Sequence, residues 1–386
     1  MKLTDLNCLH FQQCSGCVIN SQLHSPPIAQ DAIKYFKELG IPNASVVFEK
    51  GHAWRCRAKL AIRGTWENPL IGLYEENSHR VVPIPHCVVH HPLINKAVEI
   101  VKDKIISQKL PIYCEETGQG LLRYIQCFVD RKQNKVQLSA VLNLQGLEED
   151  YYEAKVKTWL MELWESGKGS LWHSIWVNFN SQRNNLIFGK QWSHIHGEEY
   201  LWEELLGFPF AFQPMVFSQA NMDLFESILR DIVQSLDSTQ KVIEYYAGIG
   251  VIGLLAAIKA QKVYSCETNP NSIELFQQTC TRWPDDIVGK MNFAATEVSQ
   301  NLDWLYRGDV LIVDPPRKGL DPLVLQKLKV GEHALKQIIY LSCGWNSFKR
   351  DCDTLLNSGW KLENAKIYIL FPGSNHIETL AWFEKV

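Results

Sequence analysis

The sequence predicts an α/β protein of two domains, in which a doubly wound, mainly parallel sheet follows an α+β domain. After Phe212, apolar strands alternate with helices, beginning with the strand at Lys241–Tyr246. Over Lys59–Leu142, by contrast, short β-branched runs are separated by glycine and polar turns, a pattern typical of antiparallel strands. A chain of 386 residues, of which 46% are apolar, is long enough for two compact units.

We expect residues 1–200 to form the first domain and residues 201–386 the second. The first is predicted to contain strands within Lys59–Val88, Leu121–Leu142 and Ser174–Phe188, and helices near Ile28–Leu39, Leu93–Ser107 and Glu153–Ser166. The second is predicted to contain helices near Asn221–Leu236, from Val251 and from Asn271, and strands at Lys241–Tyr246, Lys262–Glu267, Asp309–Val313 and Gln337–Leu341. Repeated alternation of strand and helix favours a parallel sheet, because each helix carries the chain back to the starting edge.

Composition excludes some classes of protein. No window approaches the roughly 18 uninterrupted apolar residues that a membrane-spanning helix needs, and no apolar run follows positive charge at the N-terminus. We therefore expect a cytoplasmic protein with no membrane partner. The 11 cysteines are unevenly spaced, which favours reduced thiols or metal ligands. A net charge of −3 is low for a nucleic-acid binder, although Arg55, Arg57, Lys59 and Arg63 form a local basic stretch.

A glycine-rich turn marks a candidate cofactor site. Gly248, Gly250 and Gly253 match G-x-G-x-x-G between a predicted strand and a predicted helix, where backbone can approach a ligand closely. The next strand ends at Glu267, whose carboxylate could accept both hydroxyls of a ribose. The pattern fits any adenosine-containing cofactor, a nicotinamide dinucleotide included. It also fits tight helix–sheet packing without a ligand.

A second motif narrows the choice of cofactor. Asp314-Pro315-Pro316 follows a later predicted strand, and the carboxyl ends of parallel strands face the ligand crevice. Asp-Pro-Pro at this place is typical of S-adenosylmethionine-dependent methyltransferases, where the prolines stiffen the floor of the target-base pocket and the acid lies near the cofactor. Asp314 alone could be an ordinary turn residue. Together with the glycines and Glu267, it favours S-adenosylmethionine.

Cys343 is a candidate nucleophile at the end of the strand QIIYLS. Methylation of carbon 5 of uracil needs one, because that carbon attacks a methyl group only after a thiolate has added to carbon 6. The proton left on carbon 5 must then be removed by a base. Glu378 is our choice for the base, with His376 as the neighbouring candidate. Alternatively, Cys343 is a small buried hydrophobe and Glu378 a surface carboxylate.

Five ordered segments resemble the RNA 5-methyluridine methyltransferases, the RlmC, RlmD and TrmA group. They are FQPMVFSQAN, EYYAGIGVIG, DPPRKGL, LSCGWNSFKRD and FPGSNHIE. The resemblance implies a Rossmann-like catalytic domain with S-adenosylmethionine contacts from Gln219, Tyr246, Glu267 and Asp314. It also implies that Cys343 is the nucleophile and Glu378 the base.

Some positions depart from the usual pattern of this family. Gly344 stands where the family usually has asparagine, Glu244 opens a motif that usually begins with aspartate, and Gly373 often corresponds to histidine. Because Cys8 lies close to the start, the chain most resembles the RlmC type, which lacks an N-terminal RNA-binding barrel and acts on large-subunit ribosomal RNA. Transfer RNA is the alternative substrate. A methyltransferase that acts on a nitrogen atom and a non-catalytic RNA-binding or assembly factor are the alternative functions.

Cys8, Cys14, Cys17 and Cys87 are candidate metal ligands. Four thiolates suit an iron–sulfur cluster or a tetrahedral zinc ion, and the spacing does not separate the two. The family resemblance favours a [4Fe-4S] cluster with a structural role in the N-terminal domain. Histidines beside Cys87 could compete as ligands.

The expected partner is RNA, and we expect the chain that binds it to be monomeric. A target uridine in folded RNA must be unstacked and turned into the pocket, which calls for aromatic groups at the entrance and positive charge beyond. The aromatic candidates are Phe212, Phe217, Trp345 and Phe371. The candidates for phosphate contact are Arg55, Arg57, Lys59, Arg63, Arg317 and Lys318, although each could equally lie on a merely solvated face.

Overall fold

The structure is a computed structural model that describes residues 5–145, 151, 155–167, 169–331 and 333–386. The chain divides into two compact units, which are interleaved along the sequence. The first contains the described residues up to Ser21, Lys50–Glu203 and Phe212–Met222. The second contains Gln22–Glu49, Glu204–Ala211 and Asp223–Val386.

The first unit is built around a seven-stranded sheet. Its strands are β2 (Arg57–Gly64), β3 (Pro69–Tyr74), β4 (Val81–Pro83), β5 (Leu122–Asp130), β6 (Lys135–Leu142), β7 (Trp172–Phe179) and β8 (Gln191–Gly197), and its helices are α2 (Pro92–Gln108) and α4 (Lys157–Gly167). The sheet order is β4-β3-β2-β5-β6-β7-β8. Only the β6–β7 pair is parallel among these, and α4 lies in the long connection that a parallel pair requires.

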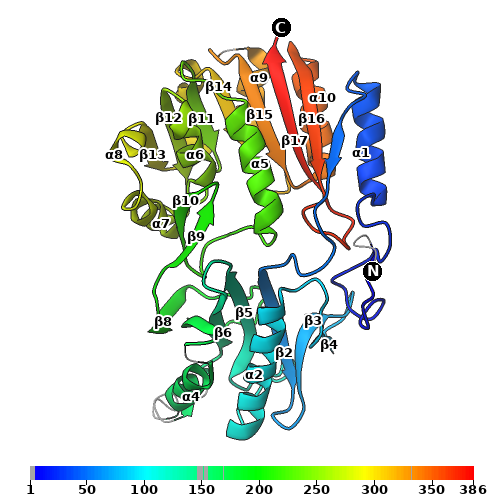
Figure 1. The fold of residues 1–386 in the computed structure, drawn as a ribbon, viewed down its shortest axis with the longest axis vertical. Helices are drawn as coiled ribbons and strands as arrows, with labels where there is room; N and C mark the ends of the chain where they lie inside the picture. The colour runs from blue at the N-terminus through cyan, green and yellow to red at the C-terminus, as the bar shows by residue number, and fades with distance from the viewer. Residues whose placement is uncertain (1–4, 146–150, 152–154, 168, 332) are drawn as a thin grey trace. The chain divides into compact units, whose positions relative to one another are not determined.

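Helices α2 and α4 cover one face of this sheet (Figure 1). Alternate side chains of β2, such as Leu60 and Ile62, belong to the large core under these helices. Ala61, between them, belongs instead to a small cluster on the opposite face, together with Tyr124. This period of two is what a sheet with one helix-covered face requires. The α+β arrangement expected for this part of the chain is therefore present.

The second unit contains an eight-stranded sheet. Its strands are β1 (Ser45–Val47), β11 (Lys241–Tyr245), β12 (Lys262–Glu267), β13 (Met291–Ala295), β14 (Val310–Val313), β15 (Gln337–Ser342), β16 (Trp360–Tyr368) and β17 (Glu378–Lys385). Its helices are α1 (Pro27–Glu38), α5 (Met222–Gln234), α6 (Val251–Lys259), α7 (Pro270–Cys280), α8 (Asp285–Val288), α9 (Pro322–Val330) and α10 (Trp345–Leu356), with 3-10 turns η2 (Val298–Gln300) and η3 (Leu302–Tyr306). A separate two-stranded sheet is formed by β9 (Leu201–Leu205) and β10 (Phe208–Phe212).

The eight strands lie in the order β1-β16-β17-β15-β14-β11-β12-β13, with helices on both faces (Figure 1). The five central and edge strands from β15 to β13 pair in parallel, which confirms the predicted α/β class. β17 runs antiparallel between β15 and β16. The first residue of β17 therefore lies at the same edge of the sheet as the last residue of β15.

The structure differs from the sequence-based expectation in two places. The expected single boundary after residue 200 does not describe the units, because α1 packs with α10 and β1 pairs with β16 in the second unit. The strand expected to continue to Phe188 ends at Phe179 and is followed by a loop. The helix expected at Glu153–Ser166 begins partly outside the described residues, and its described part is α4. In the described part of the chain, every helix is too short or too polar to span a bilayer.

Candidate active site and cysteine cavity

The turn after β11 holds its backbone in conformations that favour glycine. Gly248 has a φ of 55° and Gly250 a φ of 79°, both in the left-handed region. A Cβ atom on Gly250 would lie 2.6 Å from a ring atom of Phe276, so the turn also needs the small size of this residue. α6 begins directly afterwards at Val251. Such a turn brings backbone N–H groups to the start of a helix, where polar ligand groups are bound.

Glu267 lies against this turn, as its place at the end of β12 predicts. Its Oε2 atom accepts a hydrogen bond from the N–H of Gly248 at 2.9 Å. Its Oε1 atom accepts from the N–H groups of Thr268 and Asn269 at 2.7 and 2.9 Å. These bonds fix the orientation of the carboxylate, and Oε2, which accepts only the bond from Gly248, keeps a lone pair for a further donor such as a ribose hydroxyl.

Tyr246 lies in the same turn with a φ of 65°, which is uncommon for an aromatic residue. Its hydroxyl oxygen accepts a hydrogen bond from the N–H of Asp321 at 2.9 Å. Asp321 is the N-cap of α9, where its side chain accepts from the N–H of Leu323. Tyr246 therefore connects the glycine-rich turn to the segment that follows Asp314-Pro315-Pro316.

Glu244 is a buried acid below the turn to which the sequence assigned no role. Its carboxylate accepts hydrogen bonds from the N–H of Gly253 at 3.1 Å and from the Ser265 hydroxyl at 2.5 Å. Burial raises the pKa of Glu244 to about 8, against the effect of these two bonds. A Cβ atom on Gly253 would lie 2.3 Å from the carboxylate, so this glycine makes room for the acid. The sequence feature that could have pointed to Glu244 is the acidic residue with which this motif usually begins in the family.

Strand register brings Cys343 and Glu378 together. In the antiparallel β15–β17 pair, the last residue of β15, Ser342, lies opposite Thr379, so the register brings Cys343, which follows β15 directly, towards Glu378, the first residue of β17. In the parallel β14–β15 pair, Val313 lies beside Tyr340, which brings Asp314 to the same edge. Cys343 is half-buried, Glu378 is only 2% exposed and His376 is exposed. The structure thus groups the predicted nucleophile, the predicted base and the acid of Asp-Pro-Pro.

Burial and the neighbouring carboxyl groups oppose ionisation of the Cys343 thiol. Burial raises the pKa of Cys343 to about 11, with smaller contributions from Glu378 and Asp314. Burial raises the pKa of Asp314 to about 7, and burial together with Asp314 raises the pKa of Glu378 well above its ordinary value. Arg317 acts in the other direction and lowers the pKa of both Cys343 and Glu378. Cys343 also directly precedes Gly344, the N-cap of α10, and the N-terminal end of a helix favours negative charge.

The loop that carries Arg317 is fastened to α10. Ser347 Oγ donates a hydrogen bond to the carbonyl oxygen of Arg317 at 2.8 Å, and Arg350 Nη2 donates to that of Lys318 at 2.8 Å. A Cβ atom on Gly344 would lie 2.7 Å from the Arg317 carbonyl oxygen and 2.5 Å from Ser347 Oγ. The departure from asparagine at position 344 therefore allows the Asp-Pro-Pro loop to approach α10 closely.

Gln219 belongs to the first unit, where its side chain is buried. Its segment is held against the seven-stranded sheet by Arg57, whose Nη1 donates to Ser218 Oγ at 2.6 Å and whose Nη2 donates to the Pro214 carbonyl oxygen at 2.8 Å. The expected contact of Gln219 with S-adenosylmethionine stays a prediction.

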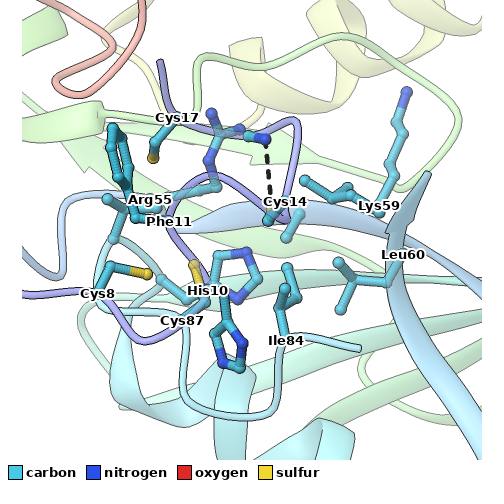
Figure 2. Close-up of a pocket in the computed structure, with 15 residues that line it drawn as sticks. Cys8, His10, Phe11, Cys14, Cys17, Arg55, Lys59, Leu60, Ile84 and Cys87 are labelled. Atoms are coloured by element: carbon cyan, nitrogen blue, oxygen red, sulfur yellow. Dashed lines mark hydrogen bonds between the residues drawn. The ribbon is translucent and has the colours of Figure 1, made fainter. Parts of the chain in front are cut away.

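The four predicted metal-ligating cysteines line one cavity of about 140 Å³ in the first unit (Figure 2). Burial raises the pKa of Cys17 to about 12, with further contributions from Cys87, Cys14 and Cys8. Within the described ranges, no group of three or more His, Cys, Asp or Glu side chains is arranged so that it could hold a metal ion as it stands. The donor atoms themselves suit soft, thiolate-bound metals.

The basic stretch is mostly occupied inside the first unit. Arg57 is buried in the contacts described above, and Arg63 is buried and paired with Glu115. Arg55 lines the cysteine cavity. Of the four cations in this stretch, Lys59 is the exposed one. The expectation that Arg57 and Arg63 contact phosphate is therefore wrong, because both guanidinium groups are buried and bonded to partners inside the first unit.

Comparison with known proteins places this geometry in context. Residues 198–386 match the family model described as tRNA (Uracil-5-)-methyltransferase. An uncharacterized RNA methyltransferase of Protochlamydia amoebophila is 42% identical over 386 residues, which cover 98% of each chain. Another, from Geobacter sulfurreducens, is 28% identical over 399 residues, covering 100% of this chain and 78% of that protein. The crystal structure of a Pyrococcus abyssi tRNA (uracil-54, C5)-methyltransferase with S-adenosyl-L-homocysteine has a similar fold, with a TM-score of 0.70, 22% identity and coverage of 92% and 82%.

Proposed function

Because the chain belongs to the family of RNA (uracil-5-)methyltransferases, which use S-adenosylmethionine, we propose that it forms 5-methyluridine through a temporary bond between Cys343 and carbon 6 of uracil. The observation that carries this proposal is the register that sets Cys343 opposite Glu378. We propose large-subunit ribosomal RNA as the substrate, with transfer RNA as the alternative. We further propose that the protein is monomeric and cytoplasmic.

The proposed reaction needs both side chains in sequence. The Cys343 thiolate adds to carbon 6, and the electrons of the ring double bond move to the carbonyl oxygen at carbon 4. Carbon 5 would then attack the methyl group of S-adenosylmethionine, whose sulfur–methyl bond would break to leave S-adenosylhomocysteine. The Glu378 carboxylate removes the proton from carbon 5, the double bond re-forms, and the Cys343–carbon bond breaks to return the thiolate. A buried carboxylate with a raised pKa is a stronger base for this step than an exposed one.

The residues of the second unit divide between cofactor and target. Gly248, Gly250 and Glu267 would hold the adenosine part of S-adenosylmethionine at the turn after β11, with the Tyr246 ring beside it. Asp314 would lie between the cofactor and the target base. Arg317 favours the thiolate, because its positive charge lowers the pKa of Cys343.

Trapping with 5-fluorouridine tests the carbon-5 chemistry. The enzyme is incubated with S-adenosylmethionine and with ribosomal or transfer RNA from cells that lack the protein and were grown with 5-fluorouracil. A denaturation-resistant protein–RNA adduct is expected, because fluorine cannot leave as a proton. The adduct should disappear in Cys343→Ala and persist in Cys114→Ala, which removes an exposed thiol outside the site. Methylation without any adduct would instead indicate a nitrogen target, and absence of methyl transfer would indicate a non-catalytic RNA-binding factor.

The RNA class that forms the adduct identifies the substrate. Sequencing of the trapped RNA locates the uridine, and mass spectrometry of 5-methyluridine in cells with and without the protein checks it. In Glu378→Gln, an adduct is expected even with ordinary uridine, because the methylated intermediate cannot lose its proton. Rapid turnover by Glu378→Gln would contradict the assigned role of the carboxylate.

We also propose that Cys8, Cys14, Cys17 and Cys87 hold a [4Fe-4S] cluster that stabilises the first unit. The shared cavity and its soft donor atoms support this. Anaerobic purification followed by iron, sulfide and zinc analysis tests it. Iron and sulfide should be present in equal amounts and absent from Cys87→Ala, with Cys114→Ala as the control. Detection of zinc without sulfide would instead mean that the four cysteines hold a tetrahedral zinc ion and not a cluster.

A further inference from the structure

A groove of about 580 Å³ lies on the face of the seven-stranded sheet that α2 and α4 leave open. Its walls come from β2, β3 and β5, from the turn between β3 and β4, and from the loop after β7. They include Lys59, Tyr74, His79, Tyr124, Asn184 and Asn185. A second hollow of about 340 Å³ shares His79, Glu115, Asn184 and Asn185 with it and extends to Arg183. Both lie wholly within the first unit.

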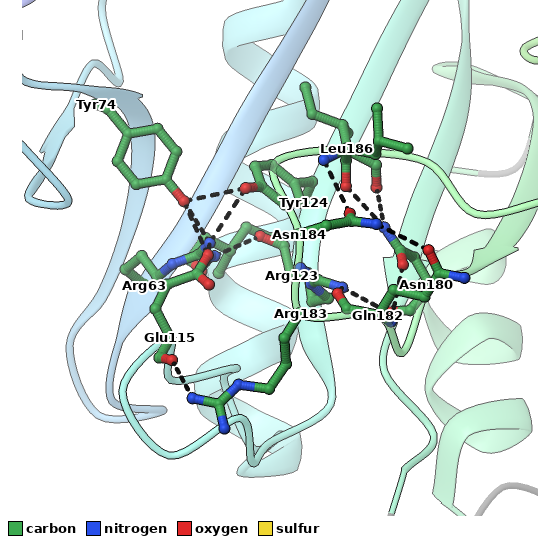
Figure 3. Close-up of polar contacts among 12 residues, drawn as sticks. Arg63, Tyr74, Glu115, Arg123, Tyr124, Asn180, Gln182, Arg183, Asn184 and Leu186 are labelled. Atoms are coloured by element: carbon green, nitrogen blue, oxygen red, sulfur yellow. Dashed lines mark hydrogen bonds and ion pairs between the residues drawn. The ribbon is translucent and has the colours of Figure 1, made fainter.

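The loop after β7 is shaped by buried polar side chains (Figure 3). Asn180 Nδ2 donates to the carbonyl oxygens of Leu186 and Ile187 at 2.8 and 3.1 Å, and Asn180 Oδ1 accepts from the N–H of Gln182 at 3.1 Å. Arg123 Nη1 donates to the carbonyl oxygens of Asn180 and Gln182 at 2.7 and 2.9 Å. These bonds hold the loop in one conformation from inside.

Arg123 shows that this conformation is maintained against an energetic cost. Its side chain is fully buried and stacks on the Tyr113 ring at 4.4 Å, and its Nε and Nη2 atoms are buried and have no hydrogen-bond partner among the described residues. Burying such groups is unfavourable. What the loop presents outward is Arg183, Asn184, Asn185 and Leu186, all exposed. An exposed loop held this firmly is typical of a binding surface rather than of core packing.

The groove is polar and aromatic, and its charged lining residues are Lys59, Glu75, Glu76 and Glu115, of which Glu75 and Glu115 are paired with arginines. Arg63 bonds to Glu115 and to the hydroxyl groups of Tyr74 and Tyr124 (Figure 3). Nearby, Arg80 is paired with Glu75. Lys59 extends its ammonium group to 4.8 Å from the Phe188 ring centroid. Aromatic rings, side-chain amides and one lysine among three carboxylates suit a planar base with polar edges better than a run of phosphates.

We propose that this groove binds an unpaired nucleotide of the RNA substrate, with its base stacked on Tyr74, its polar edges toward Asn184 and Asn185, and its phosphate near Lys59. The inference rests on RNA as the substrate, which the family gives, and not on the carbon-5 chemistry. The open face of the sheet is used as in other sheet-based RNA binders, where aromatic side chains stack unpaired bases.

Affinity for a fluorescein-labelled single-stranded RNA of mixed sequence and about 12 nucleotides, within the range that single-strand binding modules cover, tests the proposal in the full chain. Lys59→Met should weaken binding about fivefold and reduce the slope of log K against log salt by about 1. Asn185→Ala should weaken binding about fivefold without changing that slope. Lys109→Met is the matched control, because Lys109 also lies over a ring, that of Trp66 at 5.3 Å, but outside the groove.

A tyrosine pair separates stacking from folding. Tyr74→Phe and Tyr74→Leu both lose the hydroxyl that bonds Arg63, but only the leucine variant loses the ring. Tyr74→Leu should weaken RNA binding about tenfold relative to Tyr74→Phe, as expected for one lost stacking contact. Thermal unfolding of both variants, which lose the same bonds, shows whether their stabilities match.

Ultraviolet crosslinking to ribosomal RNA from cells that lack the protein locates the contact directly. Crosslinked peptides that contain Tyr74 or residues 183–185 are expected. Unchanged RNA affinity in all the groove variants, or crosslinks confined to other segments, overturns the proposal. If the groove variants bound RNA as the wild type does but bound a lysine- and arginine-rich peptide more weakly, the RNA proposal would also be overturned. The groove would then be a protein-binding site. None of these readouts requires methyl transfer, so failure of the carbon-5 chemistry and failure of the groove are distinguishable.

Discussion

The rate at which Cys343 is alkylated should depend steeply on pH. Its pKa is raised to about 11, mainly by burial, and only the thiolate reacts with iodoacetamide. A thiol with this pKa is ionised to about one part in 10⁴ at pH 7, and the ionised fraction grows about tenfold for each pH unit up to about pH 10. The alkylation rate of Cys343 in the substrate-free enzyme should follow the same course.

Peptide mass spectrometry after timed alkylation gives the rate at each pH. Cys114 in the same sample is an internal control, because it is exposed and hydrogen bonds to Thr117 lower its pKa. Its rate should level off at a lower pH than that of Cys343. Arg317→Met should slow alkylation of Cys343 severalfold at pH 8, since Arg317 lowers the pKa of this thiol. A Cys343 rate that levels off below pH 8 would refute the argument that burial keeps the thiol protonated.

Three further changes test the surroundings of the site. Gly344→Ala forces a Cβ atom to within 2.7 Å of the Arg317 carbonyl oxygen, so we expect a loss of about 1–3 kcal/mol in guanidinium unfolding and slower methylation; an unchanged variant contradicts the close approach. Tyr246→Phe removes the hydroxyl that bonds the N–H of Asp321, which should lower kcat/KM for RNA about fivefold, for about 1 kcal/mol lost, with little change in S-adenosylmethionine affinity by calorimetry. Burial raises the pKa of Glu244 in the folded protein to about 8. The wild type should therefore lose stability as the pH rises from about 4.5 towards 8. Glu244→Gln should remove this loss, which is checked by measuring the free energy of unfolding of both proteins at pH 5 and pH 8.

Candidates for the reacting groups could be named from the sequence because the proposed chemistry is demanding. Carbon-5 methylation needs a nucleophile and a base, and Cys343 and Glu378 are the residues of the right type in motifs beside predicted strand ends. How the two meet could not be predicted. It follows from the antiparallel direction of β17, and a run of apolar residues does not reveal strand direction.

The environment of the charged residues was less predictable. Arg57 bonds the carbonyl oxygen of a residue 157 positions away, and Arg63 bonds a carboxylate 52 positions away. Burial of a charge depends on such distant partners, which leave no mark on the local pattern. Lys59 lies in the same stretch and is exposed. A basic cluster in a sequence can therefore mix buried, structural cations with exposed ones.

Synthesis of the chain imposes an order on the assembly of the second unit. Residues 22–49 leave the ribosome early, but β1 has its partner only when the residues of β16 have been made, with Ser45 beside Lys366. Phe36 of α1 is fully buried against Trp345 and Phe348 in the finished protein, so its packing contacts also form only late in synthesis. The first unit can close over its core long before this happens. A fragment truncated to residues 201–386 would leave the Phe36 site on α10 uncovered, so expression of the methyl-transferring half alone should give an aggregating product.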